Sequence, residues 1–218
     1  MKLFRTLGFR LAGKGLTALL AALLLALVPA CSSDNKDGNG DSGEPNPPTE
    51  SAEPITLTLD FARGPEIATP ALPGSSKEAL TGRHEYTIDG RTFAIFADAA
   101  AKGKFFWSDQ AQYDIPEPNL ALYFSNIGAY VEFPAIEKLA LSTIEYVYSK
   151  GAGELPEFDI QTTAGDSQAH SLDFAEEGSG MTFTLLAPTA NTAYRLTVLT
   201  GKNAQPAKLV LTYTVPES

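Results

Sequence analysis

One short segment, KFFWSDQAQYD, places the only tryptophan of the chain and a tyrosine beside carboxylates and side-chain amides. An aromatic ring can pack against the apolar C–H face of a sugar while planar polar groups bind its hydroxyls. Trp107 or Tyr113 would supply the ring. The polar partners would be Asp109, Gln110 and Gln112. These residue types at this spacing predict a carbohydrate-binding loop.

The same segment also has a structural interpretation. The triplet FFW would then be a strand that supplies the core, with Trp107 at the rim, because large aromatic side chains are on average well buried. A second candidate loop, TGKNAQ, carries Asn203 and Gln205, which would point toward the same binding surface. Its alternative is a turn in which Asn203 adopts a left-handed conformation or bonds to its own backbone.

Motifs for catalysis are missing from the sequence, which has no GxSxG elbow, HExxH or P-loop. The two histidines, His84 and His170, lie far apart in expected loops, and no acidic run has calcium-loop spacing. With 26 acidic residues, accidental carboxylate pairs are easy to find and are weak support for glycoside hydrolysis. We expect no enzyme, no cofactor and no metal.

The elements that position these loops are expected to be strands, because apolar and polar residues alternate along much of the chain. Asp89-Gly90 predicts a tight hairpin, and a shift of the apolar phase near Ser142-Thr143 predicts a β-bulge. Expected strands cover 55–61, 85–89, 91–97, 119–124, 130–133, 139–148, 157–162, 181–185, 194–198 and 209–213. Short helical turns are expected at 75–80, 97–102 and 134–139. The fold class is therefore all-β, an antiparallel β-sandwich or jelly roll over residues 55–218.

The N-terminus has the pattern of a secretory leader. Basic residues precede an apolar run at 16–28, which is short for a membrane-spanning helix, so that a retained anchor is the weaker alternative. Val28-Pro29-Ala30-Cys31 resembles a bacterial lipobox, which implies cleavage after residue 30 and acylation of Cys31. We expect a lipoprotein signal peptide at 1–30.

Residues 31–54 form the expected link between lipid and domain. The segment has too few apolar side chains to fold and should be a disordered tether. The chain has 16 basic and 26 acidic residues, and four of the basic ones lie in the leader. Because an acidic surface repels phosphate and anionic headgroups, we expect no nucleic-acid partner and membrane contact only through the lipid.

The segments ITLTLDFARGP, YTIDGRTFAIFA, FFW, GAYVEFPAIEKLALSTIEY and NTAYRLTVLTGKNAQPAKLVLTY, in this order, resemble lipoproteins of gut Bacteroidales. The resemblance spans about residues 55–213 and rests on strand patterns and loops. It implies a galactose-binding-domain-like jelly roll on an outer-membrane lipoprotein that handles glycans. Ser32 resembles the outer-membrane sorting pattern, and Asp34 with Asp37 resembles a surface-export signal.

Two functions of different classes fit these observations. The first is a lipid-anchored, non-catalytic β-sandwich at the outer membrane, facing either the cell surface or the periplasm, that binds carbohydrate or a cell-surface partner. The second is a structural or adhesin-like component that contacts an envelope protein through an edge strand. A glycosidase is the third and weakest interpretation.

Overall fold

Strands dominate the residues that the structure, a computed structural model, describes: 52–175 and 179–216. Sheet A contains β1 (Ile55–Asp60), β13 (Pro206–Thr214), β7 (Ala140–Tyr148), β10 (Gly180–Leu185) and β9 (His170–Phe174), in this order. Sheet B contains β2 (Gly82–Ile88), β3 (Arg91–Ala97), β6 (Tyr130–Phe133), β11 (Tyr194–Val198) and β8 (Phe158–Thr162). Sheet C contains β12 (Asn203–Ala204), β5 (Leu120–Ser125) and β4 (Phe105–Asp109).

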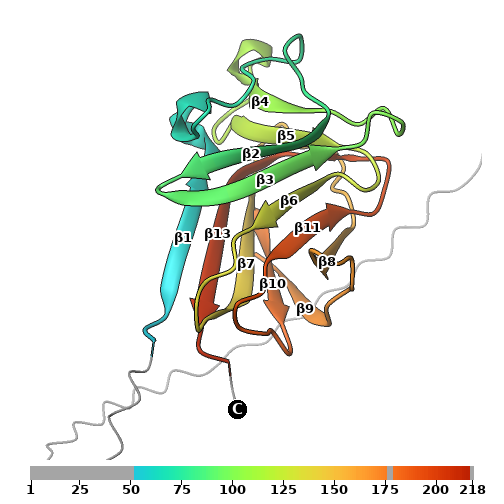
Figure 1. Ribbon diagram of the computed structural model, residues 1–218. Helices are drawn as coiled ribbons and strands as arrows, with labels where there is room; N and C mark the ends of the chain where they lie inside the picture. Colours follow the sequence, from blue (N-terminus) through green and yellow to red (C-terminus); the bar gives the residue numbers. More distant parts are fainter. Residues whose placement is uncertain (1–51, 176–178, 217–218) are drawn as a thin grey trace, which may run out of the picture. The chain divides into compact units, whose positions relative to one another are not determined.

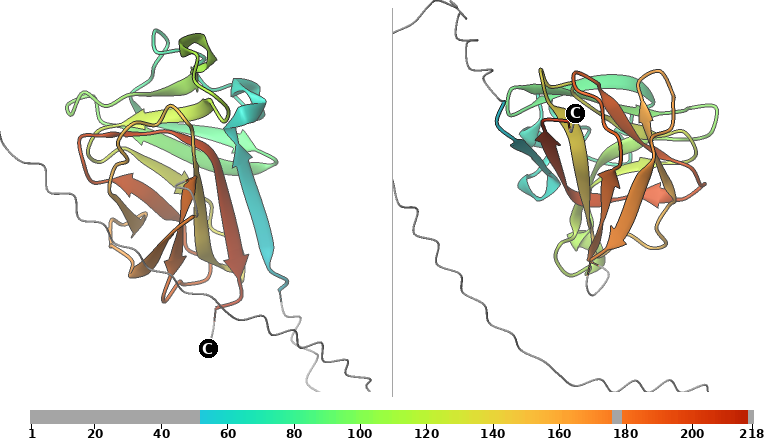
Figure 2. Two further views of the ribbon diagram at one scale, coloured as in Figure 1. Left: turned by 180° about the vertical axis from the view of Figure 1, so that it is seen from behind. Right: turned by 90° about the horizontal axis from the view of Figure 1, so that it is seen from below.

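All of these strand pairings are antiparallel. Sheets A and B lie face to face, and sheet C crosses one end of the pair (Figures 1 and 2). Short 3-10 turns follow β1 and β4: η1 (Phe61–Arg63), η2 (Pro65–Ile67) and η3 (Ala111–Tyr113). The fold class predicted from the sequence, an antiparallel β-sandwich, is confirmed.

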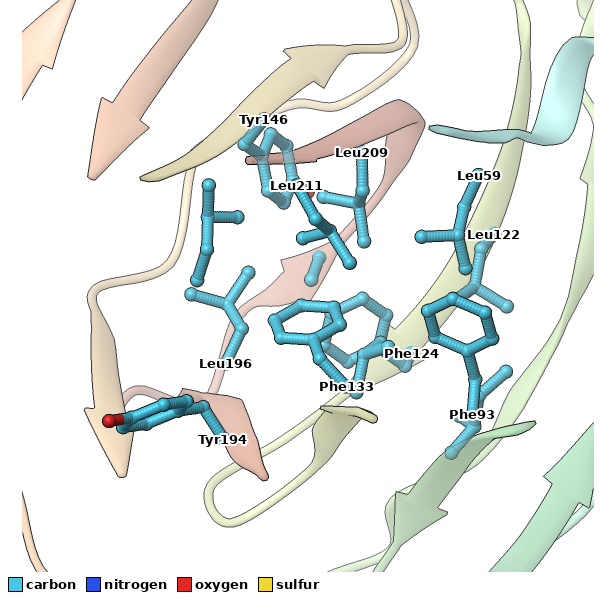
Figure 3. Packing of buried hydrophobic residues seen from close by; sticks show 14 of the residues in the cluster. Leu59, Phe93, Leu122, Phe124, Phe133, Tyr146, Tyr194, Leu196, Leu209 and Leu211 are labelled. Atoms are coloured by element: carbon cyan, nitrogen blue, oxygen red, sulfur yellow. The ribbon is translucent and has the colours of Figure 1, made fainter. Parts of the chain in front are cut away.

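The core fills the space between the sheets (Figure 3). Leu211 of β13 and Tyr146 of β7 come from sheet A, whereas Phe133 of β6 and Leu196 of β11 come from sheet B. All four side chains are at most 1% exposed. Burying one such side chain stabilises the fold by about 1.5–3 kcal/mol. The apolar residues that recur at every second position of these strands are therefore the ones that form the core between the sheets.

Two local predictions are confirmed. Asp89 and Gly90 form the two-residue turn between β2 and β3, where Ile88 pairs with Arg91. Both turn residues have positive φ, 47° and 75°, as this tight hairpin requires. In β7 the register against β13 skips Ser142, which is the bulge that the shifted apolar phase indicated.

Other local predictions were wrong. The three expected helical turns are plain turns, each with one i to i+3 backbone hydrogen bond: Glu78 N–H to Ser75 O, Lys102 N–H to Ala99 O and Leu139 N–H to Ile136 O. One such bond is too little to propagate a helix. Two strands were not predicted, β9 and the two-residue β12. The histidines also lie on strands rather than in loops, His84 on β2 and His170 on β9.

An ion-pair network that the sequence analysis did not predict crosses the outer face of sheet B. Glu132 accepts from Arg83 Nη2 at 2.7 Å and from Arg195 Nε at 2.8 Å. The Arg195 guanidinium also lies 4.4 Å from the ring centroid of Tyr130. Burial raises the pKa of Glu132, but hydrogen bonds and charges from the two arginines outweigh burial, so that the pKa lies below its ordinary value.

The predicted leader at 1–30, Cys31 and the tether as far as residue 51 lie outside the described residues. Where the structure does describe the chain, it contains no helix of the length and apolarity needed to cross a membrane.

Candidate functional site

A cavity of about 700 Å³ lies at the end of β4. Five of the seven ligand-binding candidates line it: Trp107, Asp109, Gln110, Tyr113 and Gln205. The structure thus brings together the two segments in which these candidates lie, although they are far apart in the sequence, and it places Trp107 and Asp109 on strand β4 rather than in a loop. The rest of the lining comes from other segments: Gly74, Ser75, Ser76, Lys77, Phe106, Ser108, Ile115, Tyr123 and Gly151.

The other two candidates have different positions. Gln112 belongs to the one-turn helix η3, and its side chain is not among those described. Asn203 begins β12 opposite Ser125, so the interpretation of Asn203 as a turn residue was wrong. Its side chain is hydrogen-bonded to the side chain of Tyr123, which does line the cavity. Asn203 therefore contacts the cavity wall through Tyr123 and does not line the cavity itself.

Trp107 lies at the border between core and cavity. The residue is half-buried, packs against the core cluster and also lines the cavity. Its indole Nε1–H donates to the carbonyl oxygen of Phe61 at 2.8 Å, and its backbone N–H donates to Pro73 O at 2.7 Å. The second bond holds the segment before Gly74 against β4. Trp107 thus contributes both to the packing of the core and to the lining of the cavity.

The floor of the cavity is a network of amides. Gln110 is only 6% exposed. Its Oε1 accepts from Ser149 Oγ at 2.7 Å, and its Nε2 donates to Gln205 Oε1. The backbone N–H of Gln205 donates to the Tyr146 hydroxyl at 2.7 Å. The floor is therefore tied to the core, which fixes the position of both glutamines.

Burial raises the pKa of Tyr146 well above its ordinary value, although the hydrogen bond from Gln205 opposes the rise, so the hydroxyl stays neutral. The NH₂ group of Gln205, by contrast, has no hydrogen-bond partner among the residues that the structure describes. A neutral amide with unused donors suits a ligand that presents oxygen acceptors.

Aromatic rings form one wall. Phe106 and Tyr123 stack at 4.5 Å between ring centroids, and Lys104 Nζ lies 5.5 Å from the Phe106 centroid. Burial raises the pKa of Tyr123, although hydrogen bonds to Ser125 and Asn203 oppose the rise. Tyr113 is different, because 69% of it is exposed at the cavity. It is the ring that a ligand would reach without any rearrangement.

Charges at the cavity come from Lys77 and Asp109. Asp109 Oδ1 accepts from the backbone N–H of Ala111 at 2.9 Å, which orients the start of η3 and so helps position Tyr113. Asp109 is the single carboxylate among the described residues of the lining.

Several lining residues were missed by sequence reasoning. Lys77, Tyr123 and Gly151 come from segments separated from β4 and from one another, and none belongs to a motif. Ser149, beneath the floor, was missed in the same way. The one available signal was Tyr123. Its position in the apolar strand 119–124 places an aromatic ring on the outward face of that strand, where the core does not explain it.

The histidines have structural contacts. His84 Nε2 lies 2.9 Å from Thr81 O, and its ring packs 5.6 Å from Phe105. His170 Nδ1 lies 2.9 Å from Gln168 O, with its ring 5.6 Å from Phe183. Within residues 52–175 and 179–216, no group of three or more His, Cys, Asp or Glu side chains is placed to hold a metal ion.

Comparison of the sequence with protein-family models, with curated proteins and with solved structures finds no match in any of the three.

Proposed function

We propose that this chain is a lipid-anchored protein of the outer membrane, displayed at the cell surface, whose β-sandwich binds carbohydrate without catalysis. The anchoring part of the proposal rests on the lipobox-like sequence before Cys31. The binding part rests on the cavity at the end of β4. Its volume, about 700 Å³, falls in the range of pockets that hold small ligands, about 300–1,000 Å³.

The observation that carries the proposal is the combination of an exposed ring with a fixed amide. Tyr113 offers an aromatic face to a sugar ring, and Gln205 offers hydrogen-bond donors from a position tied to the core. Lys77 and Asp109 add a donor and an acceptor at the same cavity. Pyranose rings need both kinds of contact, an apolar face for C–H groups and polar groups for hydroxyls.

The test is a glycan array probed with the full-length chain, followed by titration of the best ligand. Tyr113→Ala should weaken binding about tenfold, because a stacking contact of about 1.4 kcal/mol corresponds to that factor in Kd. Tyr113 is preferable to Trp107 as the test position. Trp107→Ala would remove a bond to Phe61 and core packing, and so would lower stability as well as binding.

The matched control is Phe174→Ala. Phe174 is 67% exposed, nearly the same as Tyr113, but does not line this cavity. Phe174→Ala should therefore leave glycan binding unchanged. An array without any ligand, or a ligand whose affinity is the same in Tyr113→Ala, would contradict the proposal. Turnover of a glycoside that disappears in Asp109→Asn would show an enzyme instead.

A further inference from the structure

A second, apolar cleft of about 440 Å³ is lined from β8 and β9, the last strands of sheets B and A. Three of the seven exposed large hydrophobic residues of the described chain line this cleft. Leu172 is 42% exposed, Phe174 67% and Leu199 46%, and all three line the cleft. Because a soluble domain seldom clusters exposed apolar side chains, this cluster marks a binding surface.

The outer edge of β9 has backbone groups available for pairing. Ala175 N–H donates to Gly180 O at 3.0 Å, and Leu186 N–H donates to Ala169 O at 2.9 Å. Together with the register, these two bonds show that the backbone groups of the odd-numbered residues of β9 are the ones that hydrogen-bond to β10. The N–H and C=O groups of His170, Leu172 and Phe174 consequently point away from the sheet. Within the described residues no strand pairs with them.

β8, the neighbouring edge, is covered by its own chain. Gln168 N–H donates to Ile160 O at 2.7 Å, and Thr162 N–H donates to Asp166 O at 2.9 Å. Among residues 52–175 and 179–216 nothing covers β9 in this way, and its sequence, HSLDF, contains neither the proline nor the lysine that commonly protects an edge strand. The contrast between the two edges favours β9 as a place for an added strand.

The side chains of β9 indicate what that strand would carry. One set of partner side chains would enter the cleft beside Leu172 and Phe174. The alternate set would lie on the outer face next to Asp173. On that face the register aligns Asp173, Thr182 and Glu145 in one cross-strand row. A basic side chain opposite Asp173 would add about 0.2–1 kcal/mol per pair.

From these observations we infer that the edge of β9 and the adjoining cleft bind an extended segment of another protein, in which apolar residues alternate with lysine or arginine. The interaction is β-strand addition, in which backbone hydrogen bonds supply affinity and alternate side chains supply specificity. A second copy of this acidic chain is a poor occupant, since its own β9 would bring further carboxylates to the same face. The inference is independent of the carbohydrate cavity.

The experiment uses the full-length chain and synthetic peptides of about six residues, a typical strand length. One set alternates Val or Leu with Lys, and the matched set alternates them with Glu. Fluorescence anisotropy should show binding of the Lys set. Phe174→Ala should weaken it about tenfold or more, because an apolar anchor leaves the cleft. Asp173→Lys should reverse the preference toward the Glu set.

Two further measurements separate strand addition from simple apolar adhesion. Methyl groups on the peptide amides that face β9 should abolish binding, whereas methyl groups on the alternate amides should spare it. Tyr113→Ala, at the other cavity, should bind the peptides as the unaltered chain does. The inference is overturned if neither set binds, or if Phe174→Ala and Asp173→Lys bind both sets unchanged. It is also overturned if the chain forms a dimer that Phe174→Ala dissociates.

Discussion

Gly151 allows a test of the amide floor with a single methyl group. A Cβ at this position would lie 2.6 Å from Cδ of Gln110 and 3.3 Å from its Nε2. The first of these distances is too short for two carbon atoms, so the Gln110 carboxamide would have to move. Because Gln110 is buried and bonded to both Ser149 and Gln205, it cannot move without losing these bonds.

The expected loss of stability follows from those bonds. Each contributes about 0.5–1.5 kcal/mol net, and a buried hydroxyl left unpaired costs about 1–3 kcal/mol. Ser149, 3% exposed, would lose the acceptor for its hydroxyl proton and keep only the 3.3 Å bond that its Oγ accepts from the Gly151 backbone N–H. The lower backbone entropy of alanine in the unfolded chain offsets about 0.4–1 kcal/mol. We expect Gly151→Ala to lower the free energy of unfolding by about 2 kcal/mol.

Urea unfolding of four proteins measures this effect: the unaltered chain, Gly151→Ala, Gln110→Ala and the double variant. In the Gln110→Ala background there is no carboxamide to displace, so Gly151→Ala should be close to neutral. Gly153→Ala is the matched control, because a Cβ there meets nothing within 4 Å. The reasoning is refuted if Gly151→Ala costs the same in both backgrounds, or no more than Gly153→Ala.

Two other predictions concern charge and location. Glu132→Gln should lower the free energy of unfolding by about 1–2 kcal/mol near pH 7, because Arg83 and Arg195 lose their shared carboxylate. The pKa of Glu132 is depressed by folding, so this stabilisation is present above the unfolded pKa of about 4.3 and is lost as the pH falls through the lower folded value. Urea unfolding at several pH values should show the gap between the two proteins closing in acid, and a gap that widens would contradict it. Cys31→Ala should move the chain from the membrane fraction to the soluble fraction, since acyl chains provide the anchor; equal membrane association of both forms would rule out lipid anchoring at Cys31.

The fold was predictable because its signal is local. Along β1 or β10 each residue has a neighbour of opposite polarity, and one buried face is enough to define a strand. The bulge at Ser142 was visible for the same reason, as a one-residue shift in that alternation. β9 carries the same alternation, with His170, Leu172 and Phe174 on one face and Ser171 and Asp173 on the other. Its apolar positions are partly exposed and its sequence has no β-branched residue, so its strand signal is weak and it was not predicted.

The candidate site was predictable where a short segment gathers suitable residue types, including Gln205 in the second loop. Trp107, Asp109, Gln110 and Tyr113 follow one another, so a single segment revealed them. Gly151 reaches the same cavity because β7 pairs with β13, which brings the segment after Tyr148 beside Gln205. The sequence of a strand does not show which distant strand it will pair with, so the position of Gly151 at this cavity could not be predicted.

β1 also determines which way the cavity faces. Its first residue, Ile55, pairs with Tyr213 near the end of β13, so the domain's two ends lie at one pole (Figure 1). Beyond its last residue comes Phe61, whose carbonyl holds Trp107 at the opposite pole. Six residues of strand span about 20 Å at roughly 3.3 Å per residue. The cavity therefore lies about one strand length from the pole at which the described domain begins and ends.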